Sequence, residues 1–152
     1  MGATHFSGPV VSGDLQQGET NGPNQGIALL TQATALSKNG SSAVSSTLYI
    51  PAGARIVDFN IDVLTAWNNA STATLTIGTA AAGTQYVGSI DAKTAGRAAI
   101  TYTAAQLAAM NGVTATGTAA PTTAPVVVTV TPSGGTAPTT GYVVVTVLYV
   151  QQ

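Results

Sequence analysis

Residues 56–65 read IVDFNIDVLT, and this stretch decides the fold class. From Val57 to Val63, apolar side chains occupy every second position and alternate with polar ones; the apolar residues there are Val57, Phe59, Ile61 and Val63. Successive side chains of a β-strand point to opposite faces, so this alternation predicts a strand with one buried and one solvated face. We expect these four apolar residues to face the core.

Strand-like stretches flank residues 56–65 on both sides, and Gly, Pro, Asn and Ser separate them as turn residues. They are residues 27–36, 44–50, 72–78, 84–90, 98–103, 126–131 and 142–150. The Ala and Leu content of residues 27–36 is also compatible with a helix. The last is a nearly continuous run of Val, Leu and Tyr, which is typical of a strand covered on both faces. About seven to nine short strands predict an all-β fold, either a β-sandwich or a jelly roll.

At most one short helix interrupts this pattern. Thr103 can cap a helix over residues 104–110, and Gly112 follows its end. Leu107 and Met110 would share one face of this helix. So short a helix is not stable alone, so that face must dock on the sheet. Residues 113–125 predict a long loop with room for one edge strand.

Residues 1–25 differ from the rest and predict an extended N-terminal arm in front of a β-sandwich domain of residues 26–152. Gly and Pro recur in the arm, and no apolar period is sustained. Such a segment buries too little surface to offset its ordering entropy. It still holds apolar anchors such as Phe6 and Val10, so we expect it to become ordered on a partner.

The chain carries few charges. Charged residues make up 6% of the 152 residues, where about 25% is usual. Residues 98–152 contain no Asp, Glu, Lys or Arg. Uncharged surface costs little to desolvate, whereas burying even a paired charge is expensive. The composition therefore favours burial of the outer surface against neighbouring subunits over a bland surface without such a role. The uncharged loops at residues 113–125 and 132–141 are the regions where we expect such contacts, together with the arm.

The composition also argues against several function classes. The net charge is −1 and no run of Lys or Arg occurs, so we expect no binding to nucleic acid or to an anionic membrane. The absence of Cys excludes disulfides, thiolate catalysis and cysteine metal sites. No apolar stretch of about 18 residues is present to span a bilayer. The N-terminus lacks the pattern of a secretory signal, so we expect synthesis in a cytoplasm.

Residue types that carry catalysis are scarce. The one histidine, His5, lies in the arm, where it is not held against a nucleophile as a Ser-His-acid site requires. Asp58 and Asp62 are roughly 13 Å apart along one strand, too far for a carboxylate pair. With Asn60 they offer oxygen ligands for Ca²⁺, but the calcium-loop spacing is absent. We favour a solvated strand face that pairs with Lys or Arg, and we expect no enzyme, no metal and no cofactor.

The end of the strongest strand leaves two interpretations open. Trp67, Asn68 and Asn69 follow it directly. Trp67 either caps the rim of the core or lies in an interface, where Trp is enriched. Together with Asp91, these residues could also bind a sugar, with its ring stacked on Trp67. A carbohydrate- or receptor-binding module is therefore the alternative function.

Five stretches of the chain, in this order, resemble the head decoration (cement) proteins of tailed bacteriophages. They are THFSGPV at residues 4–10, IPAGA at 50–54, ATLTIGT at 73–79, KTAGR at 93–97 and GYVVVTV at 141–147. None of them is a catalytic signature. Their order and the composition of the whole chain carry the resemblance.

The resemblance implies a β-sandwich or jelly-roll body, commonly a homotrimer, that sits on the outer capsid surface at local threefold positions and stabilises the shell. The expected partners are the major capsid protein and further copies of this chain, after synthesis in the host cytoplasm. An arm in such proteins reaches along the shell, so we expect capsid or neighbour contacts from Thr4, His5, Phe6, Ser7, Gly8, Pro9 and Val10. Trp67, Asn68 and Asn69 are a second candidate interface. The alternative is a binding module of a fibre or of another minor virion protein.

Overall fold

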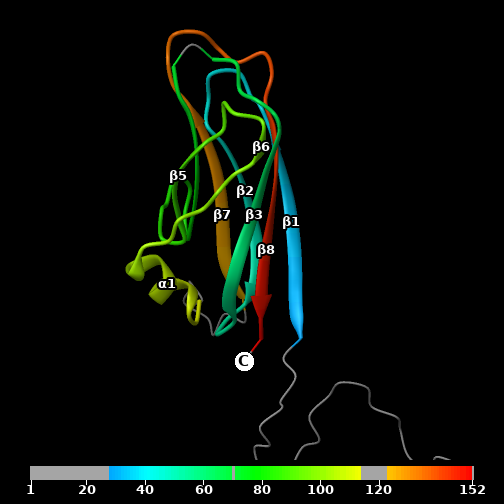
Figure 1. Cartoon of the computed structure of the whole chain (residues 1–152), viewed down its shortest axis with the longest axis vertical. Helices are drawn as coiled ribbons and strands as arrows, with labels where there is room; N and C mark the ends of the chain where they lie inside the picture. Colours follow the sequence, from blue (N-terminus) through cyan, green and yellow to red (C-terminus); the bar gives the residue numbers. More distant parts are fainter. Residues whose placement is uncertain (1–27, 70, 114–122, 152) are drawn as a thin grey trace, which may run out of the picture.

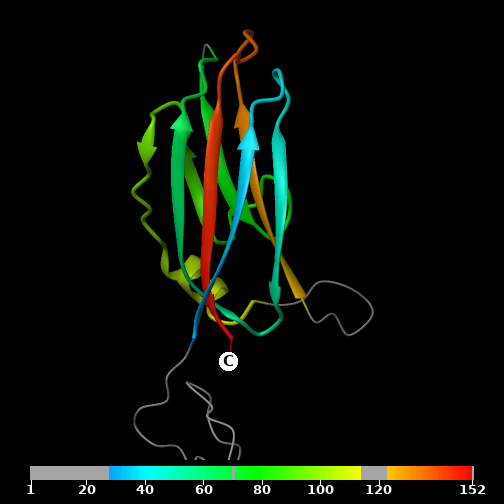
Figure 2. The same ribbon diagram turned by 90° about the vertical axis from the view of Figure 1, so that its right-hand side faces the viewer.

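The computed structural model describes residues 28–69, 71–113 and 123–151, in which two four-stranded antiparallel sheets pack face to face (Figures 1 and 2). The strands are β1 (Leu29–Ser37), β2 (Val44–Pro51), β3 (Arg55–Thr65), β4 (Ala73–Gly78), β5 (Val87–Asp91), β6 (Gly96–Arg97), β7 (Thr123–Pro132) and β8 (Tyr142–Val150), with one helix, α1 (Ala104–Met110). The predicted arm, with His5 and the contact residues 4–10, lies outside the described residues.

The first sheet has the strand order β1-β8-β3-β6 and the second has the order β2-β7-β4-β5. This arrangement confirms the predicted all-β sandwich. The jelly-roll variant stays an interpretation, which rests on the order of the strands. The first strand pairs with the eighth, the second with the seventh, the third with the sixth and the fourth with the fifth. One long hairpin folded over itself would give these pairs.

Strand β3 confirms the strongest predicted strand but corrects its first inward residue. Phe59, Ile61 and Val63 are buried as predicted, whereas Val57 is 46% exposed and Ile56 takes the buried position. The register against β8 shifts between Ile56 and Asp58, which is a β-bulge. A bulge inserts one extra residue, and a shift of one residue sends a side chain to the other face. The prediction that Val57 faces the core is therefore wrong.

Strand β8 coincides with the predicted strand at residues 142–150, but only one of its faces is fully covered. Val143, Val145, Val147 and Tyr149 lie in the core between the sheets. The alternate residues point outward and remain partly exposed. Strand β8 lies between β1 and β3, so its backbone is paired on both sides. The prediction of two covered faces is wrong for the chain as it stands, and half of the Val-rich run is on the surface.

Two other predicted strands change in the structure. Residues 98–103 do not form a strand: after β6 the chain runs without regular structure into α1. Strand β5 begins at Val87, three residues after the predicted start at residue 84, and Ala82 before it lies over Thr129 on the outer face of the second sheet. There the Ala82 amide donates a hydrogen bond to Thr129 Oγ1 at 3.0 Å.

Strand β7 begins at Thr123, inside the predicted loop of residues 113–125, and lies between β2 and β4 rather than at an edge. Residues 114–122 of that loop lie outside the described residues. Strands β1, β2 and β4 confirm the predictions for residues 27–36, 44–50 and 72–78 over the parts described, so the helix left open for residues 27–36 is wrong.

Helix α1 confirms the predicted helix. Thr103 is its N-cap, and a capping box joins the Thr103 side chain to the Gln106 amide and the Gln106 side chain to the Thr103 amide. Met110 is buried as expected, whereas Leu107 is 52% exposed. The predicted docking face is therefore only half buried. No helix in the described part of the chain is long and apolar enough to cross a bilayer.

Candidate functional site: two halves of one sheet face

The outer face of the first sheet divides along its strands into an uncharged half and a charged half. Residues that pair across antiparallel strands share a face, so the partners of the outward residues of β8 are outward as well. The uncharged face, as we name it, comprises Leu29, Thr31, Ala33, Ala35 and Ser37 of β1 and Tyr142, Val144, Thr146, Leu148 and Val150 of β8. Its β1 members and Tyr142 are exposed, and its other β8 members are partly buried.

The charged half of this face lies on β3 and β6 and contains an ion pair. Arg97 Nε donates to Asp62 Oδ1 at 2.7 Å, and Arg97 Nη2 donates to Asp62 Oδ2 at 3.0 Å. These hydrogen bonds lower the pKa of Asp62 below its ordinary value. The expected pairing of this strand face with Lys or Arg is thereby confirmed for Asp62. Within the described ranges, no group of three acidic or histidine side chains could hold a metal ion.

The same half holds a second polar contact, which anchors the irregular segment before α1. The Tyr102 hydroxyl donates to Asp58 Oδ1 at 2.6 Å, and the same oxygen accepts from the Phe59 amide at 2.8 Å. Burial, and then the hydrogen bond to Asp58, raises the pKa of Tyr102 well above its ordinary value. The Asp58 carboxylate therefore accepts hydrogen bonds from two other groups of the same chain.

Trp67 belongs to the core. It is 1% exposed, and a Cβ on Gly141 would come within 2.5 Å of its ring. Of the two interpretations of Trp67, burial therefore supports core packing and not a surface contact. A ring that is covered in this way cannot stack on a sugar, so the alternative function loses the aromatic platform expected for it.

The two asparagines after Trp67 stabilise loops. Asn69 is 2% exposed, and its Nδ2 donates to the carbonyl oxygens of Thr72 and Ser133 at 2.7 Å each. Asn68 is exposed, and its Oδ1 accepts from the amides of Thr139 and Thr140. Trp67, Asn68 and Asn69 thus do not form one joint surface.

Asp91, the remaining residue of the expected sugar site, is engaged within its own turn. Its carboxylate accepts from the Lys93 amide at 2.9 Å and from Thr94 Oγ1 at 2.7 Å, and these hydrogen bonds lower its pKa. Lys93 Nζ donates to the carbonyl oxygens of Asn69 and Ser71. The Asp91 carboxylate and the Lys93 ammonium are therefore both occupied by hydrogen bonds to other groups of the chain.

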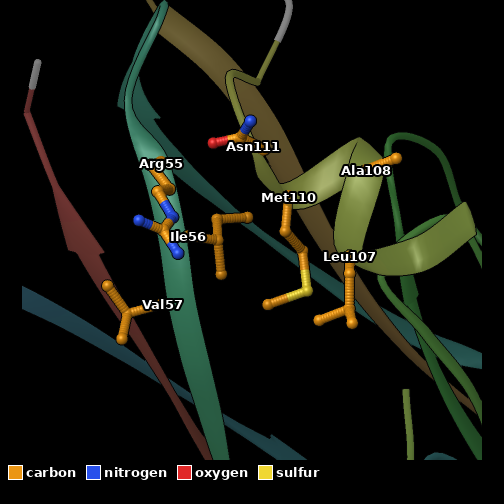
Figure 3. Close-up of a pocket in the computed structure, with 7 residues that line it drawn as sticks. All are labelled: Arg55, Ile56, Val57, Leu107, Ala108, Met110 and Asn111. Atoms are coloured by element: carbon orange, nitrogen blue, oxygen red, sulfur yellow. The ribbon is translucent and has the colours of Figure 1, made fainter. Parts of the chain in front are cut away.

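A groove of about 530 Å³ lies between the start of β3 and α1 (Figure 3). It is lined by Arg55, Ile56, Val57, Leu107, Ala108, Met110 and Asn111. Within the described residues, the Arg55 guanidinium has no carboxylate within ion-pair distance. We name this feature the Arg55 groove.

Sequence reasoning did not single out either the uncharged face or the Arg55 groove. The uncharged face had a signal: Thr146, between Val145 and Val147, is a polar residue inside a run that otherwise suits a buried strand. The groove had no such signal. Val57 keeps its place in the alternation of apolar and polar residues, so the sequence does not mark the bulge that turns Val57 outward.

Comparison of this chain with protein-family models, with curated proteins and with solved structures finds no match. Any statement about function therefore has to rest on the residues and surfaces described above.

Proposed function

We propose that this chain is a non-enzymatic virion structural protein that binds the outer surface of a phage capsid as a homotrimer and stabilises the shell. The observation that carries the proposal is the uncharged face of β1 and β8. A neighbour that covers this face displaces water from Thr, Ser and aliphatic groups and has no charge to desolvate. The composition of the whole chain, with 6% charged residues, favours the same mode of action.

The area of the uncharged face decides whether other parts of the chain must contribute to the interface. Two strands of nine residues each give a face about 30 Å long and about 10 Å wide, or roughly 300 Å². A stable pair of proteins buries about 800 Å² on each partner. The uncharged face is therefore too small by itself. In this proposal, the arm residues from Thr4 to Val10 and the loop at residues 132–141 supply further contacts to the major capsid protein and to neighbouring copies.

Stabilisation of a shell follows from mass action. A protein that binds the assembled shell, and not loosened capsomers, shifts the equilibrium toward the assembled state. A trimer engages several capsomers at once, so its second and third contacts form at a high effective concentration. Closed threefold symmetry matches the local threefold positions of a shell. Neither a cofactor nor a bound nucleotide is needed for this role.

Electron microscopy tests the proposal directly. The purified chain is mixed with shells assembled from the major capsid protein of the phage whose genome carries it in this proposal, and its mass in solution is measured by sedimentation. We expect a trimer mass and regular extra density at local threefold positions, together with shells that withstand higher temperature. Shells that look the same with and without the chain would contradict the proposal. Fibre-like tips in images of the purified chain alone would favour the alternative of a carbohydrate- or receptor-binding module.

A further inference from the structure

The Arg55 groove combines a cation with exposed apolar side chains. Arg55 and Val57 line one side from β3, and Leu107 lines the other from α1 (Figure 3). Val57 is 46% exposed and Leu107 is 52% exposed. The other cations of the chain have neighbours or lie elsewhere: Arg97 pairs with Asp62, Lys93 donates to carbonyl oxygens, and Lys38 follows the far end of β1. A groove of this kind suits a segment that has an acidic residue next to an apolar one.

The described chain starts close to this groove. Leu29 pairs with Val150, and Val150 pairs with Arg55, so the three residues form one row across the first sheet. Neighbouring strands are about 4.8 Å apart, which places the start of β1 about 10 Å from Arg55 along this row. Strand β1 begins at the same end of the sandwich as α1 (Figure 1).

The residues that precede β1 have the complementary composition. Residues 1–27 contain two acids, Asp14 and Glu19, and no Lys or Arg. From Asp14 to Glu19 the sequence reads DLQQGE, so Leu15 directly follows Asp14. Glu19 is ten residues before Leu29, and ten residues span up to about 33 Å. The chain before β1 is therefore long enough to turn back to the groove.

We propose that the acidic stretch at residues 14–19 docks in the Arg55 groove of its own molecule. A carboxylate of this stretch pairs with Arg55, and Leu15 covers the exposed side chains of Val57 and Leu107. This inference goes beyond the proposed function and does not depend on it, because the contact forms within one molecule in the absence of any shell.

Proteolysis of the full chain tests the docking. Glu19 is the sole glutamate of the sequence, so a glutamate-specific protease cuts the chain at one site inside the docked stretch. We expect Arg55→Gln to speed this cut about two- to five-fold, the factor that an exposed ion pair supports. Leu15→Ser should act in the same direction. Lys38→Gln is the matched control, because it removes a cation at the far end of β1, and it should leave the rate unchanged. Equal rates in the original chain, Arg55→Gln and Leu15→Ser would overturn the proposal.

A distance measurement provides a second, independent test. The chain has no cysteine, so Gln17→Cys offers a unique position for a nitroxide label. We expect the label to broaden the backbone amide signals of Leu107, Ala108 and Asn111, and we expect Arg55→Gln to weaken that broadening. Amides near Asn39, at the far end, should stay sharp. Unbroadened groove amides would overturn the proposal. So would equal broadening in a mixture where the label and the isotope are on different molecules, because the contact would then form between copies.

Discussion

The two halves of the outer face of the first sheet differ in how their side chains are satisfied. Thr146 of β8 and Asn60 of β3 are direct partners in one row, yet they belong to different halves. On the charged half, Asp62 is held by Arg97, and Asp58 is held by Tyr102. On the uncharged face, no hydrogen bond joins the described outward side chains to one another. On one half of the sheet face, polar side chains are held by contacts within the molecule. On the other half, the described outward side chains have no such contacts with one another, and a neighbour could cover them without burying a charge.

The largest expected effect follows from placing a charge on the uncharged face. Thr146→Glu puts a carboxylate at its centre, where covering the face would bury an unpaired charge. We expect shell binding to fall about a hundredfold, because an unpaired buried charge costs several kcal/mol. Co-sedimentation with shells over a range of protein concentrations measures this loss.

Asn60→Glu is the matched control, since it adds the same charge one strand away in the same row. Its binding should stay within about threefold of the original, because that half already carries charges that remain in water. If both variants bind equally well, the uncharged face is not the contact. If both lose binding equally, the contact covers the whole sheet face and the distinction between its halves fails.

The next effect separates the inner and outer faces of β8. Val145 has no exposed surface, whereas Val144 points outward and is partly exposed. We expect Val145→Ala to lower the free energy of unfolding by about 2 kcal/mol, because it removes buried methyl groups and leaves a cavity. Val144→Ala should cost less than about 1 kcal/mol in the isolated chain. Urea unfolding of both variants, followed by the single Trp67, measures the difference. Equal losses would mean that the outer face is already covered in solution, as in a stable oligomer.

A smaller effect concerns the polar anchor on the charged half. Tyr102→Phe removes the hydrogen bond to Asp58 and should lower the free energy of unfolding by about 1 kcal/mol. The pKa of Tyr102 is raised in the folded protein, so its contribution is fully present below the ordinary tyrosine pKa and is lost as pH rises through the folded value. Stability should therefore fall above about pH 10, the unfolded tyrosine value.

Urea midpoints at rising pH check this prediction in the original chain and in Tyr102→Phe. The variant should show a weaker alkaline loss, and Tyr86, whose pKa is raised by burial, contributes to the loss that remains. The same alkaline slope in both proteins would show that the anchor does not contribute.

The sequence predicted elements whose signals are local, and it missed features that depend on pairing. Residues 142–150 carry a long β-forming run, and Thr103 and Gly112 mark the two ends of the helix, so β8 and α1 could be placed from a few neighbouring residues. The bulge at Val57 depends on the register against β8, which lies about ninety positions further on. The burial of Trp67 depends on its contact with Gly141. No local pattern contains such information.

The candidate surfaces were predictable only in part, for the same reason. Low charge predicts that neighbouring subunits cover some of the surface, but the composition of a chain does not locate a face. The uncharged face exists because pairing places Ala33 and Ala35 of β1 beside Thr146 and Val144 of β8. Likewise, Arg55 and Leu107 meet at one groove only because α1 packs near the start of β3.

The smallest expected effect is on the Arg97–Asp62 pair, and it tests why the charged half has charges at all. Both side chains reach solvent, so replacing the pair by Asp62→Asn and Arg97→Gln should change Tm by less than about 3 °C. The pKa of Asp62 is lowered in the folded protein, so its contribution is present above the ordinary aspartate pKa and is lost as pH falls through the folded value. The double variant should therefore lose this part of the acid sensitivity.

If the pair exists to keep its half of the face in water, the variant should also self-associate more strongly in sedimentation, since the uncharged surface then extends from β8 onto β3. An unchanged sedimentation profile would limit the role of the pair to joining β6 to the sheet.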